Sequence, residues 1–480
     1  MPEKKEPSFD PIGATADAIG STVGKLFEEA PHHKGTFAHL LSLHAFVHWA
    51  AEWGISRVVI LMPMMLAIII TIFNLLPEAP ALIMSWFFLS FPIWGPLSLG
   101  LGFTRVWHWY VQSLFLAKKK TILFEIKLPR EVAKSPRAME VVFDSIWTSG
   151  GETTVIDRWF EGKMRPFFSF ELVSLGGEVH MYVWCWRSFK EVIETAIYAQ
   201  YPEVEIVEAE DYAAKFVYNP DEYDMFGNNQ ILEGDQTGVL PIRSYIDYEL
   251  DRDPKEEFKI DPIAQVFEVM SSLRGSEQAW IQIIISSCKG GSRRKFLDAA
   301  NEKVAEIRKK ASLNPGKEDA PESDERKYGF PRPTWIENET IQAIQRHSSK
   351  KLYYTGIRLC YIAKISDYRS DVRSAIRWIF LPYTNERMNW LRPSGWHGPF
   401  DWPWQDFQGI RWRLTSRRFL DAYRRRSYFY PPWITNDGNF AVMSTESLAS
   451  IWHPPGATVK SPGLQRISST KSEPPPNLPM

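Results

Sequence analysis

Two long stretches of this 480-residue chain lack any charged residue. They run from 58 to 77 and from 79 to 104, and only Glu78 separates them. About twenty helical residues, each rising 1.5 Å, reach roughly 30 Å, which is the thickness of a bilayer's hydrocarbon core. Because the connector around Glu78 is long enough only for a tight turn, the sequence predicts a transmembrane helical hairpin at 57–104. A buried hairpin of a soluble core is the alternative interpretation.

The tip of this hairpin also lacks lysine and arginine, whereas its other end is flanked by basic residues. These are Arg57 before the first run, and Arg105, Lys118, Lys119 and Lys120 after the second. The positive-inside rule then places both termini and the large domain in the cytoplasm. We therefore expect an inner-membrane protein with the lipid bilayer as its first partner. Residues 1–56 are expected to be a cytoplasmic and interfacial segment, and 105–120 a basic juxtamembrane segment.

Motifs for common catalytic and cofactor sites are missing. The three cysteines, Cys185, Cys288 and Cys360, form no CxxC pair and no plausible disulfide framework. There is no G-x-x-x-x-G-K-[ST], HExxH or G-x-S-x-G. We therefore expect no cofactor, no metal and no enzymatic activity. Asp251 and Asp253 form a D-x-D like that of membrane glycosyltransferases, so a glycosyltransferase-like enzyme that uses them is an alternative. A membrane scaffold protein is another.

Charge is unevenly distributed although the formal net charge is only −1. Residues 150–270 contain 25 acidic and 10 basic residues, whereas residues 340–480 contain 9 acidic and 20 basic ones. Such asymmetry indicates either a polyanion-binding end or two parts of one molecule that attract each other.

The region 121–212 has the element order of a ferredoxin-like domain, β-α-β-β-α-β. The expected elements are a strand at 121–129, a helix at 135–147, strands at 167–174 and 178–187, a helix at 189–200 and a strand at 204–209. Gly176 and Gly177 are expected to form the hairpin turn between the two middle strands.

A second, similar unit is predicted at 241–451, after a linker at 213–240. Its expected elements are a strand at 242–250, a helix from 263, strands at 280–286 and 351–365, a helix at 369–380 and a short strand near Phe440. An insertion at 290–334 is expected to combine a basic helix with a disordered connector. Residues 452–480 contain seven prolines and are expected to form an extended tail. The predicted fold class is α+β, with a transmembrane hairpin followed by two ferredoxin-like units.

The segment 395–433 interleaves arginines with aromatic residues. Its candidate contact residues are Arg411, Arg413, Arg417, Arg418, Arg424, Arg425, Arg426, Trp412 and Tyr423. Guanidinium groups neutralise phosphates and aromatic rings stack on bases, so the composition suits single-stranded DNA. Anionic lipid headgroups have the same chemistry. A packed element whose arginines pair with the acidic region 150–270 is the third interpretation, and the composition leaves all three open.

Several short sequence segments together resemble one family, the membrane-anchored N-terminal region of conjugative, type IV secretion-like DNA-transfer ATPases of the HerA/FtsK superfamily. The matching stretches are 125–130, 134–140, 280–282, 355–359 and, most specifically, Ser444–Gly456 with 461–462 and 474–479. In that family a tail of this kind leads into the ATPase domain, which is absent from these 480 residues. The resemblance implies a non-catalytic accessory subunit of a DNA-transfer machine, with the ATPase motor supplied in trans and a homo-oligomer as a further expectation.

Overall fold

The computed structural model describes residues 57–129, 134–151, 154–252, 260–313, 333–397, 400, 402, 404–434, 440–456, 459 and 461–467. The interfacial helix expected before residue 57 and the connector expected after residue 313 lie outside the described residues, and so do residues 468–480 of the expected tail. The chain divides into two compact units, residues 1–89 with 401–405 and residues 90–400 with 406–480.

The charge-free stretches form two helices, α3 (Arg57–Leu75) and α4 (Ala79–Lys118). In the described part of the chain, α4 is the one helix long and apolar enough to cross a membrane, and only 6% of its most apolar window is buried. The apolar part of α3, Met62–Leu75, is shorter. The helix predicted for 79–104 is confirmed, but α4 continues for fourteen more residues, because its last turns pack against the globular domain.

Ten strands form one sheet in the described residues. They are β1 (Thr121–Pro129), β2 (Phe167–Leu175), β3 (Glu178–Trp186), β4 (Glu205–Ala209), β5 (Tyr223–Leu232), β6 (Gln278–Ser287), β7 (Leu352–Lys364), β8 (Leu391–Ser394), β9 (Ala441–Ser444) and β10 (Arg466–Ile467). The central order is β4-β1-β3-β2-β6-β7-β5-β8, with every neighbouring pair antiparallel. β9 also pairs with β7, and β10 lies parallel to β1.

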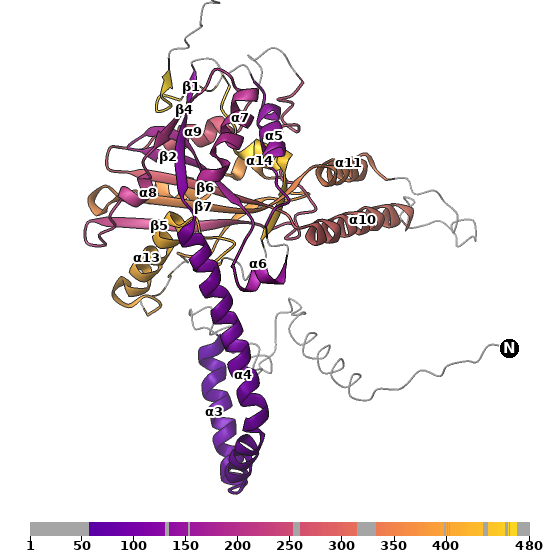
Figure 1. Ribbon diagram of the computed structural model, residues 1–480, viewed down its shortest axis with the longest axis vertical. Helices are drawn as coiled ribbons and strands as arrows, with labels where there is room; N and C mark the ends of the chain where they lie inside the picture. The colour runs from indigo at the N-terminus through magenta and orange to yellow at the C-terminus, as the bar shows by residue number, and fades with distance from the viewer. Residues whose placement is uncertain are drawn as a thin grey trace, which may run out of the picture. The chain divides into compact units, whose positions relative to one another are not determined.

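Ten further helices belong to this domain in the described residues. They are α5 (Pro136–Ser145), α6 (Val155–Trp159), α7 (Lys190–Gln200), α8 (Tyr212–Lys215), α9 (Ile263–Ser271), α10 (Gly290–Leu313), α11 (Trp335–Ser349), α12 (Ser370–Arg377), α13 (Ile410–Arg424) and α14 (Thr445–Ile451). Figure 1 shows the helices on both faces of the sheet, with α10 and α11 projecting side by side from it.

The sheet consists of two halves with the same connectivity. β1, α5, β2, β3, α7 and β4 make the first half, and β5, α9, β6, β7, α12 and β8 make the second. In each half the first strand lies between the third and the fourth. The halves join where β2 pairs with β6, and Glu171 faces Gln282 at the middle of that pairing. The mixed α+β class is confirmed, and the strands predicted at 121–129, 167–174, 280–286 and 351–365 are present.

The predicted first strand of the second half was wrong. Residues 242–250 form turns, and the strand is instead β5, inside the expected linker at 213–240. Its centre, from Gly227 to Gln230, is polar and resembles a loop in composition. The sheet overrides this weak local preference, because β7 and β8 flank β5 on both sides and supply its backbone hydrogen bonds. The short strand expected near Phe440 is present as β9, but it pairs with β7, and the fourth strand of this half is β8.

Helices cover both faces of the sheet, so alternate side chains enter two separate cores. On the first face, α5, α7, α9, α12 and α14 pack over residues such as Phe124, Phe170 and Ile281. On the second face, α8, α13 and the loop after it pack over Trp184 and Trp280. This second layer comes from outside the two repeated halves. It consists of the basic, aromatic segment 395–433 together with α8.

The described first part of the expected tail packs against the domain. Trp452 is completely buried, with its ring 4.9 Å from that of Phe170. Arg466 and Ile467 form β10 beside β1. Large apolar side chains after Trp452, such as Val459 and Leu464, explain this result, because they fill the first core despite the surrounding prolines.

Candidate functional site

A pocket of about 540 Å³ lies where α4 meets the second face of the sheet. α4 forms one wall, and the aromatic rings of Phe167, Trp184 and Trp186 line another. The remaining lining residues belong to β1, the start of α8, the end of α13 and the loop beyond it. The full lining is Trp109, Ser113, Leu116, Ala117, Lys119, Thr121, Phe167, Trp184, Trp186, Asp211, Asp421, Arg424, Arg425, Pro431 and Pro432.

The wall formed by α4 is fixed to the domain by several contacts. Trp107 Nε1 donates a hydrogen bond of 2.7 Å to the carbonyl oxygen of Trp159, just after α4 leaves its charge-free stretch. Val111 is buried, and its backbone leaves no space for a Cβ on Gly162, which has a φ of +63°. Further along, Lys119 Nζ lies 5.2 Å from the ring centre of Trp186. The end of the candidate membrane helix is therefore attached to the domain over more than three turns.

A buried ion cluster lies beneath the pocket. Arg426 is 1% exposed, and its guanidinium group contacts Glu171 at 3.0 Å and also pairs with Asp211. Burial alone would lower the pKa of Arg426, but the carboxylates of Glu171 and Asp211 raise it well above its ordinary value. Arg426 is therefore charged. Because Asp211 is 28% exposed and lines the pocket, it connects the cluster to the pocket.

Two of the predicted contact residues, Arg426 and Tyr423, are buried, and a third, Trp412, is half-buried. Arg426 is in the ion cluster, and the hydroxyl of the fully buried Tyr423 lies 2.9 Å from that of Tyr212. Trp412 stacks on His397 with ring centres 4.0 Å apart and donates to Asp224. These three side chains have structural roles, and Arg426 and Tyr423 are not accessible to a ligand at the surface. Arg426 thereby forms the pairing with the acidic region that was one of the three interpretations.

The other predicted contact residues lie near the pocket or on the surface. Arg424 is half-buried and donates to the carbonyl oxygens of Ala213 and Phe216. Arg425 is exposed and pairs with Asp421 at 2.8 Å, so both arginines lie at the rim of the pocket. The remaining four, Arg411, Arg413, Arg417 and Arg418, are exposed on α13. The predicted contact residues thus fall into three groups, namely buried or half-buried side chains, residues at the rim of the pocket and residues on the exposed surface of α13.

The residues predicted to flank the membrane differ in their exposure. Arg105 and Lys118 are exposed on α4, and Lys120 is exposed just after it. Lys119 is half-buried over the rings of Phe115 and Trp186. Arg57 is the first residue of α3.

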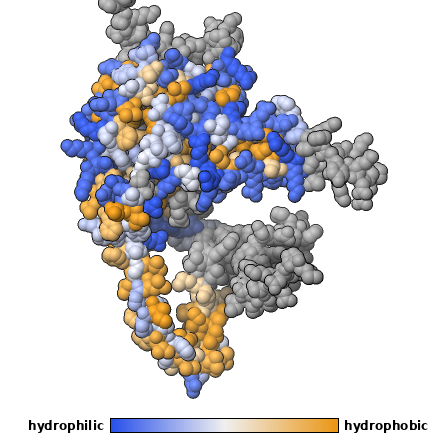
Figure 2. All heavy atoms as spheres, turned by 45° about the vertical axis from the view of Figure 1, so that its right-hand side comes forward, coloured by the Kyte–Doolittle hydropathy of each residue, from blue (hydrophilic) through white to orange (hydrophobic). Residues whose placement is uncertain are grey.

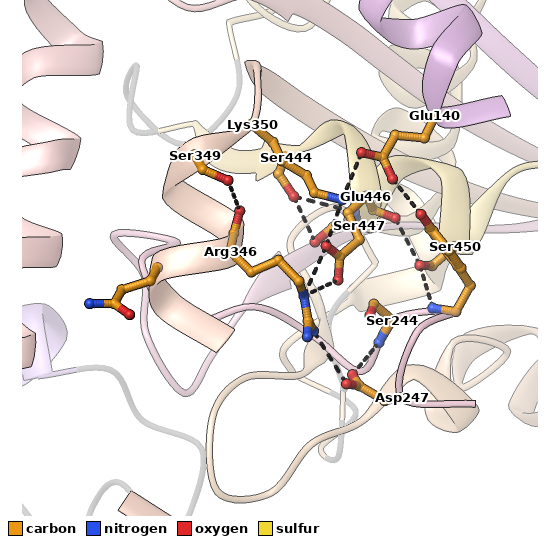
Figure 3. Close-up of polar contacts among 12 residues, drawn as sticks. Glu140, Ser244, Asp247, Arg346, Ser349, Lys350, Ser444, Glu446, Ser447 and Ser450 are labelled. Atoms are coloured by element: carbon orange, nitrogen blue, oxygen red, sulfur yellow. Dashed lines mark hydrogen bonds and ion pairs between the residues drawn. The ribbon is translucent and has the colours of Figure 1, made fainter. Parts of the chain in front are cut away.

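A second cluster of charged side chains brings together segments that are far apart in the sequence (Figure 3). Lys350 Nζ contacts Glu140 at 2.7 Å and Glu446 at 2.9 Å. Arg346 also contacts Glu446 at 3.1 Å and forms an ion pair with Asp247 at 3.4 Å. Burial would raise the pKa of Glu446, but the charges of Arg346 and Lys350 contribute to an overall pKa below its ordinary value of 4.5. Glu446 is therefore ionised and fully paired at neutral pH.

In the described residues, the cysteines and the other candidate metal ligands do not form a catalytic or metal-binding cluster. Burial raises the pKa of Cys185 and of Cys288 to about 12, and raises that of Cys360, so all three thiols are neutral. The described residues contain no group of three or more His, Cys, Asp or Glu side chains placed to hold a metal ion. Asp251 is described, whereas Asp253 lies outside the described residues, so the D-x-D alternative remains a prediction.

Sequence reasoning missed the aromatic wall of the pocket. In β3, Trp184 and Trp186 alternate with Val183 and Cys185, so both faces of the strand are apolar. A strand that is apolar on both faces is typical of a sheet covered on both sides. That signal could have predicted the second layer, although not which segment supplies it. A search for similar proteins found no matching protein-family model and no matching curated protein.

Proposed function

We propose that this protein is a non-catalytic, membrane-anchored accessory subunit of a conjugation or type IV secretion-like DNA-transfer machine. It works with an ATPase motor whose phosphate loop these 480 residues do not contain. In this proposal α3 and α4 form a transmembrane hairpin in the inner membrane. The two halves of the sheet are ferredoxin-like units in the cytoplasm, an assignment that the order β4-β1-β3-β2 and its counterpart β8-β5-β7-β6 support.

One observation carries the proposal. The described segments that resemble the DNA-transfer family are scattered over more than 300 residues, yet they belong to one sheet and the helices that cover it. Lys350 joins Glu140 of the segment 134–140 to Glu446 of the segment 444–456 (Figure 3). Gln282 of the segment 280–282 and Arg358 of the segment 355–359 are paired in register between β6 and β7. Such convergence supports a resemblance to one folded domain rather than a set of chance matches.

The attachment of α4 supports the anchoring part of the proposal. Hydrophobic residues cover the long helices in Figure 2, whereas the visible face of the domain is largely hydrophilic. Since the last turns of α4 pack against the domain, α4 would hold the domain close to the bilayer. A fixed platform of this kind suits a subunit that positions a motor and DNA at the membrane.

The test is genetic and biochemical, in the cell that encodes the protein. Deleting the gene should abolish DNA transfer, and cross-linking in native membranes should recover a protein with a G-x-x-x-x-G-K-[ST] loop. As a comparison, Leu97→Arg with Leu101→Arg places two charges in the charge-free part of α4, far from the domain core. This variant should fold but fail to complement, because each charge disfavours insertion by about 3 kcal/mol. Normal DNA transfer in the deletion strain would refute the proposal.

A second test concerns DNA itself. The full-length protein in detergent should bind single-stranded DNA, and the triple variant Arg413→Gln, Arg417→Gln, Arg418→Gln should bind it more weakly. Each lost phosphate contact should reduce the salt slope by about 0.7. Arg252→Gln, which removes an exposed charge elsewhere, is the control. Equal affinities for the triple variant and the control would remove DNA binding from the function of α13.

A further inference from the structure

The loop that contains α6 presents an apolar surface that the proposed function does not use. Val155, Ile156 and Phe160 are 70%, 62% and 67% exposed, although each is a large hydrophobic residue. Three such side chains within six residues are unusual at a surface that faces only water. Their helix is nevertheless well formed, because Thr154 and Asp157 make a reciprocal capping box at its start.

Contacts with α4 fix the height of this loop. Trp107 Nε1 donates to the carbonyl oxygen of Trp159, and the ring of His108 lies 5.1 Å from that of Trp159. Trp107 follows Arg105, the residue that ends the charge-free stretch, by only two positions. At 1.5 Å per residue the loop is therefore held about 3 Å from the level of Arg105 along the helix axis. Figure 1 shows α6 beside α4 at the end of the domain from which α4 emerges.

The side chains around this level are typical of a membrane–water boundary. Trp109 and Tyr110 are about half exposed on α4, next to the contact with Trp159. Tryptophan and tyrosine are enriched at the headgroup level, where one end of the ring is apolar and the other polar. The exposed apolar residues of α6 thus belong to a loop that is attached to the candidate membrane span close to the end of its charge-free stretch.

The acidic residues of the loop are neutralised within it. Lys163 Nζ contacts Asp157 at 2.8 Å and Glu161 at 2.6 Å, and these two carboxylates raise the pKa of Lys163. Because both carboxylates are paired, they oppose an approach to anionic headgroups less than free carboxylates would. Together with Arg158, which is exposed on α6, the two carboxylates and Lys163 sum to no net charge in residues 154–163.

We infer that α6 is an interfacial membrane contact, whose Val155, Ile156 and Phe160 side chains enter the headgroup region of the bilayer beside α4. The inference rests on the proposed membrane span of α4 and deepens it. In addition to the proposed transmembrane helices, α6 gives the domain a second contact with the bilayer, on one side of α4. The occupant of this surface is the lipid bilayer itself.

The test uses the full-length protein in nanodiscs that contain nitroxide-labelled lipids. A fluorophore is attached to Ile156→Cys and, as a matched control, to Val192→Cys. Val192 is 49% exposed and belongs to α7, a helix at the opposite end of the domain from α6 in Figure 1. The native cysteines Cys185, Cys288 and Cys360 are buried, and labelled wild type gives the background. We expect quenching at position 156 to be at least about threefold that at 192, since interfacial residues penetrate roughly 5–10 Å.

A second variant tests the apolar contact itself. With the probe at position 156, Phe160→Ser should reduce quenching, whereas Val192→Ser should leave it unchanged. Equal quenching at 156 and 192 in a protein that resists carbonate extraction would overturn the inference and leave the membrane span intact. Extraction of the whole protein by carbonate would overturn the span of α4, and the inference with it. Shielding of the probe at 156 by single-stranded DNA instead of lipid would also overturn it.

Discussion

Replacing Arg426 by methionine tests whether the basic segment is primarily structural. The variant leaves the carboxylate of Glu171, which is fully buried, without its main cationic partner. Breaking a buried ion pair from one side typically costs about 3–5 kcal/mol. Methionine fills a similar volume and places no new demand on the backbone, because arginine already adopts a φ of +49° at this position. The decrease in the free energy of unfolding therefore measures the effect of removing the charge.

The size of the effect can be expressed as a melting temperature. Unfolding entropy is about 2.1 cal/mol/K per residue, so for the larger unit, residues 90–400 with 406–480, it is roughly 0.8 kcal/mol/K. A loss of about 4 kcal/mol then lowers the Tm by roughly 5 °C. Near-ultraviolet circular dichroism of the full-length protein in detergent micelles measures this transition, because the second core is rich in tryptophan and tyrosine.

Two companion variants make the result interpretable. Arg418→Met removes an exposed arginine from the same segment and should change stability by no more than about 0.5 kcal/mol. The double variant Glu171→Met with Arg426→Met should recover most of the loss, since no charge remains uncompensated in the interior and Asp211 is partly hydrated. A loss below about 1 kcal/mol for Arg426→Met, or one equal to that of Arg418→Met, would refute a structural role for the cluster.

Three further predictions follow from other parts of the domain. Glu446→Gln should destabilise the protein at pH 7, and the difference from wild type should shrink as the pH falls below about 4.5. This sign follows because the pKa of Glu446 is lowered in the folded state, so its stabilising effect is lost on protonation; a pH series of thermal melts measures it. Gly162→Ala should weaken the contact between the α6 loop and α4, because a Cβ would collide with the backbone of Val111 at a residue with positive φ; faster amide exchange at Val111 is the expected result, and unchanged exchange would contradict the contact. Trp452→Ala should cost about 3–5 kcal/mol in thermal or chemical unfolding, whereas a fully extended tail would show almost no change.

The elements that the sequence predicted well are those with strong local signals. Charge-free runs, the largely apolar stretches of β2 and β6 and the glycine turn at Gly176 predict structure within a few residues, because each depends on side chains close in the chain. The errors occurred where local signals were weak. The polar centre of β5 resembled a linker, but neighbouring strands determined its conformation. The prolines after Trp452 gave no sign that the described part of the tail packs into the first core.

In the candidate site, too, the sequence predicted some features and the tertiary structure decided others. Composition alone identified the arginines and aromatics of 395–433 and the membrane-flanking lysines. It could not separate Arg426 from Arg418, because the difference depends on Glu171 and Asp211, which lie more than 200 residues away in the chain. Nor could it place Lys350 between Glu140 and Glu446. The sequence by itself determined that this protein has a candidate membrane span followed by a mixed α+β domain. Only the tertiary structure decided which charges are buried and paired, because burial and pairing are properties of contacts between distant segments.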